Sequence, residues 1–234
     1  MNALLEFAQG PLFKFSFALM ILGSLRIIAL TLFGMGEALL RTGDRKINYG
    51  EIVRDTFSWL FPVRRWATSR PVYSLISMAF HVGLILVPFF LAAHIGLWKQ
   101  ATGVAWPAMP QLFADALAVV VILGGPALLL GRLFYRSART ISRFQDYIWP
   151  PMLTVPALTG FLCANCGLSA GAYQSCMLIH VVSANLIMIF IPFTKLAHCV
   201  LMPITQLVGS IGWKFRVGAG SRIERTLGKR GQES

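Results

Sequence analysis

The run LFADALAVVVILGGPALLLGRLF, residues Leu112–Phe134, is almost entirely apolar, and its charged residues Asp115 and Arg132 lie near its ends. A helix must place about 20 apolar residues in the hydrocarbon to cross a bilayer. No water is available there to hydrogen-bond an irregular backbone. The run therefore predicts a transmembrane helix.

Four more runs of this kind are spread along the chain. They lie at Leu12–Gly34, Val72–Trp98, Ile148–Leu168 and Met177–Leu207. The first is too long for a secretory signal and is not followed by a small-residue cleavage site, so we expect it to remain in the protein. The sequence predicts an all-α, polytopic membrane protein that is a bundle of five transmembrane helices.

The composition of the 234-residue chain agrees with this prediction. Hydrophobic residues make up 56% of it and charged residues 13%, about half of the usual share of roughly 25%. This composition excludes a soluble globular protein, a disordered chain and a disulfide-dense secreted scaffold. The net charge of +12 comes from basic residues in short clusters between apolar runs, so we expect a lipid bilayer as partner and no nucleic acid.

The basic clusters also predict the orientation of the chain. They lie at residues 41–70, 136–143 and 214–230, whereas the connections at 101–111 and 169–175 contain no Lys or Arg. Lys and Arg favour cytoplasmic loops, so we expect the N-terminus outside and the C-terminus inside. Residues 1–213 form the expected membrane domain and residues 214–234 a basic cytoplasmic tail. Residues 51–70 mix charged and apolar side chains and predict an amphipathic segment on the inner surface, a solvated loop helix, or a basic aromatic surface that docks a soluble subunit.

All four histidines, His81, His94, His180 and His198, fall in the predicted spans. Ionisable residues inside a membrane are costly and usually functional, and imidazole is an axial ligand of haem iron. The second span runs outward and the fifth inward, so each has one histidine near each face. This pattern predicts two haem b groups, an inner one held by His81 and His198 and an outer one held by His94 and His180. Alternatively, the histidines hydrogen-bond within the bundle or line a proton path.

Helical periodicity supports one span more than the other. His180 and His198 are eighteen residues apart, which is about five turns of one helix, so they share a face. His81 and His94 are thirteen residues apart, and an ideal helix would turn the second ring well away from the first. Pro88 lies between them, and a kink or local rewinding there would bring His94 round.

Parts of these spans resemble a known family. The fifth span reads HVVSANLIMIFIPFTKLAH from His180 to His198, and its end resembles the last span of the cytochrome b (gamma) subunit of respiratory nitrate reductase. FHVGLIL, which begins at Phe80, is similar to that family's second span, and LGSLR at Leu22–Arg26 occupies a similar place in the first. The resemblance covers the five-helix body, and the chain departs from the family in its wider histidine spacing around Pro88.

The resemblance implies a di-haem b subunit that is not a catalyst alone, with His81, His94, His180 and His198 as the ligands. It implies electron transfer between a quinone such as menaquinone, or a periplasmic cytochrome c, and a cytoplasmic iron–sulfur subunit. The compact length is similar to that of the small membrane cytochrome of the high-molecular-weight cytochrome c complex of sulfate reducers. We would then expect other membrane subunits, a periplasmic multihaem cytochrome c and the inner membrane of a bacterium.

Two basic residues inside spans are further candidates for cofactor binding. Arg26 lies in the middle of the first span, where a bare charge costs at least about 2.5–3.5 kcal/mol. It either pairs with a haem propionate or extends toward the membrane surface. Lys195 lies three residues before His198, and the same two interpretations apply to it.

Three cysteines, Cys163, Cys166 and Cys176, lie at the outer ends of the fourth and fifth spans. Covalent haem c requires Cys-x-x-Cys-His, but Gly167 follows Cys166. A zinc site would need a fourth ligand, and none is evident. A structural disulfide that involves Cys176 is reasonable if the outside is oxidising, and an iron–sulfur centre shared with a partner is a remote alternative.

These observations favour an electron-transfer membrane subunit over a protein of another class. The rival is a polytopic transporter or membrane assembly factor whose histidines handle protons or metal. Transporters often contain repeats and interrupted spans around a midplane site, whereas the histidines here lie near two faces. A reduced-minus-oxidised optical spectrum would distinguish the two hypotheses.

Overall fold

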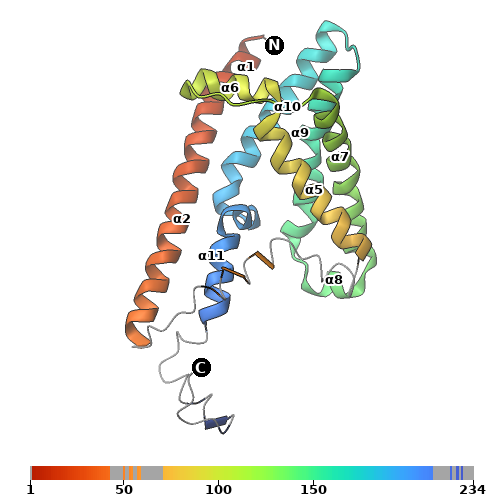
Figure 1. Ribbon diagram of the computed structural model, residues 1–234. Coiled ribbons are helices and arrows are strands. Elements are labelled where there is room, and N and C mark those ends of the chain that lie inside the picture. The colour runs from red at the N-terminus through yellow and green to blue at the C-terminus, as the bar shows by residue number, and fades with distance from the viewer. Residues whose placement is uncertain are drawn as a thin grey trace. The chain divides into compact units, whose positions relative to one another are not determined.

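The computed structural model describes residues 2–42 and 71–212, with a few isolated positions between 50 and 58 and between 222 and 228. These residues form helices joined by short connections, and no β-strand occurs among them (Figure 1). Five helical segments are long and apolar enough to cross a membrane: Ala3–Arg41, Pro71–Phe90, Gln111–Phe134, Phe144–Asn165 and Ala170–Phe193. The prediction of an all-α protein with five membrane spans is confirmed.

The chain divides into two compact units. The first contains Met1–Met20 and Arg64–Phe190, and the second contains Ile21–Val63 and Ile191–Ser234. We describe each unit by itself. The expected cytoplasmic tail at 214–234 and the expected amphipathic segment at 51–70 lie almost entirely outside the described residues.

Four helices of the first unit pack in the order of the chain. They are α5 (Pro71–Phe90), α7 (Gln111–Phe134), α9 (Phe144–Asn165) and α10 (Ala170–Phe190), with the short α8 (Arg136–Ile141) between α7 and α9. Each contacts the next, and Phe80, Val121 and Leu128 form the buried core between α5 and α7. The short connections from α7 to α9 and from α9 to α10 favour this arrangement because they leave these helices antiparallel neighbours.

Glycines allow these helices to approach closely, as small residues commonly do between membrane helices. A Cβ at Gly83 of α5 would lie 2.6 Å from a methyl carbon of Val121 on α7. On the other side of α7, a Cβ at Gly125 would overlap the hydroxyl of Thr154 and come within 2.9 Å of the Pro150 carbonyl oxygen. α7 therefore lies between α5 and α9 at contact distances that only glycine permits.

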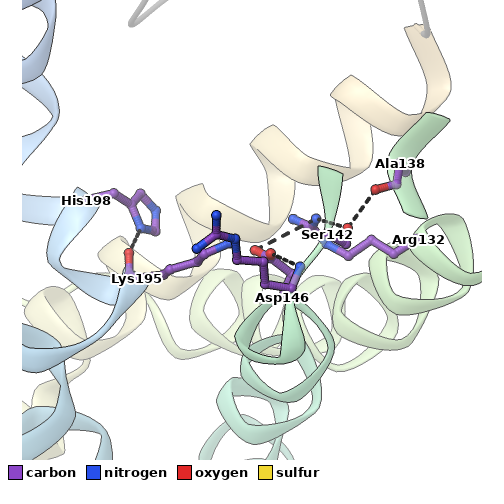
Figure 2. Close-up of polar contacts among 7 residues, drawn as sticks. Arg132, Ala138, Ser142, Asp146, Lys195 and His198 are labelled. Atoms are coloured by element: carbon purple, nitrogen blue, oxygen red, sulfur yellow. Dashed lines mark hydrogen bonds and ion pairs between the residues drawn. The ribbon is translucent and has the colours of Figure 1, made fainter. Parts of the chain in front are cut away.

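A polar network holds the junction between α7 and α9, and Figure 2 shows its side chains. The Arg143 backbone N–H donates to Asp146 Oδ2 at 2.8 Å, which caps the start of α9. Arg132 of α7 donates to Ser142 Oγ at 3.2 Å and lies 3.9 Å from Asp146 Oδ1. This network satisfies charges that the apolar body could not accommodate unpaired.

A π-helical turn joins the N-terminal helix to the first long helix. It covers Ala8–Leu12 and lies between α1 (Asn2–Phe7) and α2 (Phe13–Thr42). The side-chain amide of Asn185 on α10 donates to the Ala8 carbonyl at 3.0 Å, and Asn185 is only 1% exposed. A π-turn disturbs the regular backbone ladder, and here a buried side chain bonds a carbonyl at the disturbance.

The second predicted span consists of two helices in place of one. α5 ends at Phe90, Leu91 is extended with φ −72° and ψ 131°, and α6 (Ala92–Thr102) follows in a different direction (Figure 1). Two backbone carbonyls at the end of α5 receive donors from the next connection. Trp106 Nε1 donates to Phe89 O at 2.7 Å and the Met109 N–H to Phe90 O at 2.9 Å. We expected the kink at Pro88, but the break lies three residues later, at Leu91.

The fifth predicted span is also interrupted, so the expectation of one straight helix with His180 and His198 on a common face is wrong. α10 ends at Phe190, two 3₁₀ turns cover Ile191–Phe193 and Lys195–Ala197, and α11 (His198–Ile211) follows. Pro192 has no N–H to continue the helical ladder. In the second unit it packs on α2, where a Cβ at Gly23 would lie 2.6 Å from the proline ring.

Candidate functional site

The rings of His94 and His180 lie together in the first unit. Their centres are 6.0 Å apart and their planes differ by 6°. His94 is in the first turn of α6 and His180 is in the middle of α10. The break at Leu91 allows His94 to reach this position, so the structure brings together the two residues that we assigned to the outer haem.

Both rings make the same kind of hydrogen bond through Nδ1. His94 Nδ1 lies 3.2 Å from the Val87 carbonyl oxygen, and His180 Nδ1 lies 2.8 Å from the Pro156 carbonyl oxygen. A carbonyl oxygen only accepts, so Nδ1 carries the hydrogen in each ring. In the neutral ring the lone pair is then on Nε2. Histidines that bind metals are commonly oriented by such a bond from their other nitrogen.

The surroundings of His94 favour its neutral form. α6 lies outside the five candidate spans. Burial lowers the pKa of His94 below its ordinary value, and the backbone bond with Val87 partly offsets this effect. Since only the neutral imidazole can bind a metal through Nε2, the shift favours the ligand form near neutral pH.

Gly160 of α9 provides the space that the His180 ring occupies. A Cβ at this position would lie 2.9 Å from His180 Cε1 and 3.0 Å from His180 Nδ1. Both distances are shorter than or at the limit of ordinary carbon contacts, so a side chain here would have to displace the ring. The α9 backbone therefore sets the position of His180 twice, through the Pro156 carbonyl and through Gly160.

The separation of the two rings can be compared with that of two imidazoles bound to one metal ion. A metal lies about 2.0–2.1 Å from an imidazole nitrogen, so two rings on opposite sides of one ion have their centres about 6 Å apart. Within the described ranges, no three His, Cys, Asp or Glu side chains gather as a metal site would require.

The other two histidines show the same Nδ1 pattern. His81 Nδ1 lies 2.6 Å from the Ser77 carbonyl oxygen, and His198 Nδ1 lies 2.7 Å from the Lys195 carbonyl oxygen (Figure 2). His81 belongs to the first unit and His198 to the second. Their pairing around an inner haem therefore remains a prediction.

The two basic candidates lie in the second unit. Arg26 is exposed in the middle of α2, and Lys195 is exposed at the first position of a 3₁₀ turn. Lys195 contacts His198 through its backbone carbonyl. Pairing of either side chain with a haem propionate remains a prediction.

Sequence reasoning missed three parts of this site, namely Gly160 and the carbonyls of Val87 and Pro156. A glycine inside a membrane helix indicates close approach of another segment, and Gly160 carried that signal. It also missed the aromatic contacts that hold α6. Trp98, one turn after His94, lies 4.8 Å from Phe17 and 5.7 Å from Trp106 between ring centres.

The chain has a relative in Nitratidesulfovibrio vulgaris (strain Hildenborough), a sulfate reducer. The two proteins are 31% identical over 169 residues, which are 72% of this chain and 73% of the relative. This chain belongs to the same family. The relative's name, Protein, states no activity. No family model and no solved structure matches the chain.

Proposed function

We propose that this chain is a haem b-containing electron-transfer subunit of a respiratory redox complex in the inner membrane of a bacterium. The observation that carries the proposal is the His94–His180 pair, with parallel rings 6.0 Å apart and both Nδ1 atoms bonded to backbone carbonyls. In this proposal the Nε2 atoms of the two rings would hold one metal.

The residues of the chain have distinct roles in this proposal. His94 and His180 hold the outer haem, and the Val87 and Pro156 carbonyls orient their rings. When bound, haem b supplies a one-electron couple whose potential depends on its axial ligands and burial. His81 and His198 hold the inner haem, and Arg26 and Lys195 neutralise propionates.

The electrons pass between a quinone such as menaquinone, or a periplasmic multihaem cytochrome c, and a cytoplasmic iron–sulfur subunit. The resemblance to the gamma subunit of respiratory nitrate reductase supports electron transfer between the two sides of the membrane. The relative from a sulfate reducer supports the narrower likeness to the small membrane cytochrome of the high-molecular-weight cytochrome c complex. Other membrane subunits complete the assembly.

The test is the haem content of the purified protein. A reduced-minus-oxidised spectrum and a pyridine-haemochrome assay should give about two haems b per chain. His180→Ala should reduce this number to about one because it removes one of the two residues that would hold the outer haem. Ile179→Ala changes the neighbouring, exposed position of α10 and should retain both haems.

Two results would contradict the proposal. A wild-type protein without a haem spectrum would favour the transporter or assembly factor, whose histidines act on protons or metal. Equal haem content in His180→Ala and Ile179→Ala would show that His180 is not a ligand.

A further inference from the structure

The contact surface between α9 and α10 continues beyond the His180 ring. One turn before His180, the thiol of Cys176 donates to the Thr159 carbonyl oxygen on α9 at 3.3 Å. Cys163 follows Thr159 by one turn of α9, so it lies on the face of α9 that Thr159 presents to Cys176. Cys163 and Cys176 are therefore neighbours along the α9–α10 surface on which Gly160 receives the His180 ring.

Cys163 and Cys176 form a pair that is not part of a larger cluster. Both are half-buried, whereas Cys166 is exposed. No group of three His, Cys, Asp or Glu side chains that could share a metal occurs in the described part of the chain. Two neighbouring thiols without further ligands suit a disulfide better than a zinc or iron–sulfur site.

The pair lies at the end of the helices that we predict to face outward. The connection between α9 and α10, residues 166–169, contains no Lys or Arg, in contrast to the basic residues 136–143 before α9. On the outer side of a bacterial inner membrane, disulfides form and persist.

We propose that Cys163 and Cys176 form a disulfide that joins α9 to α10 one turn from His180. The oxidant is a protein that carries a reactive disulfide. A thiolate of the pair attacks that disulfide and releases one of its sulfurs as a thiol. The second thiolate then attacks the mixed disulfide and releases the other. The pair loses two protons and two electrons, and the oxidant gains both as its two thiols.

The disulfide fixes the distance between the two helices at the place where Gly160 receives the His180 ring. The bond therefore positions His180 through the backbone without contacting it. The proposal goes beyond the proposed function and does not depend on bound haem.

The test is a disulfide map of the Cys166→Ser variant, in which Cys163 is the single remaining cysteine near the end of α9. Membranes are quenched with acid, free thiols are alkylated under denaturing conditions, and the protein is digested without reduction. Trypsin is unsuitable because no Lys or Arg lies between Arg143 and Lys195. Chymotrypsin cuts after Leu168 and Tyr173 and so separates Cys163 from Cys176.

We expect a linked pair of peptides that contain Cys163 and Cys176, with only Cys199 alkylated. Phosphine reduction should separate the peptides and lower the apparent unfolding temperature of Cys166→Ser. It should leave the unfolding temperature of Cys163→Ser unchanged. Alkylation of Cys163 and Cys176 in the unreduced Cys166→Ser protein would overturn the proposal. Neither the disulfide map nor the unfolding temperature measures haem content. Alkylation of both cysteines would therefore leave the proposed function intact.

Discussion

The position of the His180 ring depends on the absence of a Cβ atom at Gly160 of the neighbouring helix α9. The ring occupies the space in which any residue other than glycine at position 160 would place its Cβ. Its Nδ1 donates to the carbonyl of Pro156, which lies four residues before Gly160 on α9. A ligand fixed by backbone atoms keeps its direction whether or not a metal is bound, which reduces the reorganisation on binding.

Gly160→Ala should weaken the outer haem site. The added methyl group must move the His180 ring or separate the helices, and such overpacking costs about 1–3 kcal/mol. The upper part of that range corresponds to more than a tenfold loss in affinity. Optical titration of haem into the apoprotein would measure it. Gly171→Ala is the matched control because it lies on α10 with nothing near its Cβ position. Equal affinities in the two variants would contradict the role of Gly160.

The four histidines could be selected from the sequence because an ionisable residue in an apolar run is conspicuous. The groups that contact these histidines could not be selected from the sequence. Contacts such as Gly160 with His180 depend on the register between two helices, which is set by the connection of residues 166–169 and by packing along the whole interface. Periodicity within one helix contains no information on that register.

Prolines alone do not determine where these helices break. Pro126, Pro150, Pro151 and Pro156 all lie inside continuous helices, and Pro88 lies inside α5. Membrane helices tolerate proline where neighbouring groups bond the freed carbonyls. The break at Leu91 is accompanied by tertiary bonds from Trp106 and Met109 to the end of α5, which the sequence pattern does not reveal.

Gly125→Ala should destabilise the packing of α7 on α9. The new methyl group would overlap the Thr154 hydroxyl and crowd the Pro150 carbonyl, so we expect a cost of about 1–3 kcal/mol in the free energy of unfolding. The apparent unfolding temperature in detergent would report it. Gly34→Ala in α2 has open space at its Cβ position and serves as the control.

A double variant tests whether the contact between Gly125 and Thr154 causes this destabilisation. Thr154→Ala removes the hydroxyl, so Gly125→Ala should cost less in that background, and the difference is the coupling energy of the two positions. Strictly additive effects would show that the destabilisation does not arise at this contact.

Hydropathy was sufficient to count the spans but not to group them. It predicted five, and the described residues contain five. The division into two units at Phe190 was not predicted. Apolar runs report transfer into lipid, which each helix satisfies independently, whereas grouping depends on which surfaces fit each other.

The orientation of the whole molecule remains a prediction that reporter fusions can test. A reporter active only outside the cytoplasm should be active when inserted near Ser169 and inactive when fused after Ser234. A reporter inserted at Gly103, in the other connection without basic residues, should match the one near Ser169. The opposite pattern would exchange the inner and outer haems and place Cys163 and Cys176 on the reducing side.

Because of the π-turn at Ala8–Leu12, the number of residues in the N-terminal segment determines how α1 is rotated relative to α2. A π-turn accommodates one residue more than an α-turn. Deleting one residue there could restore a regular helix, but it would rotate α1 by about 100° relative to α2. The Ala8 carbonyl would then point away from Asn185, and a buried amide would lose its acceptor. Homologues with one residue fewer in this turn should therefore carry an apolar side chain in place of Asn185.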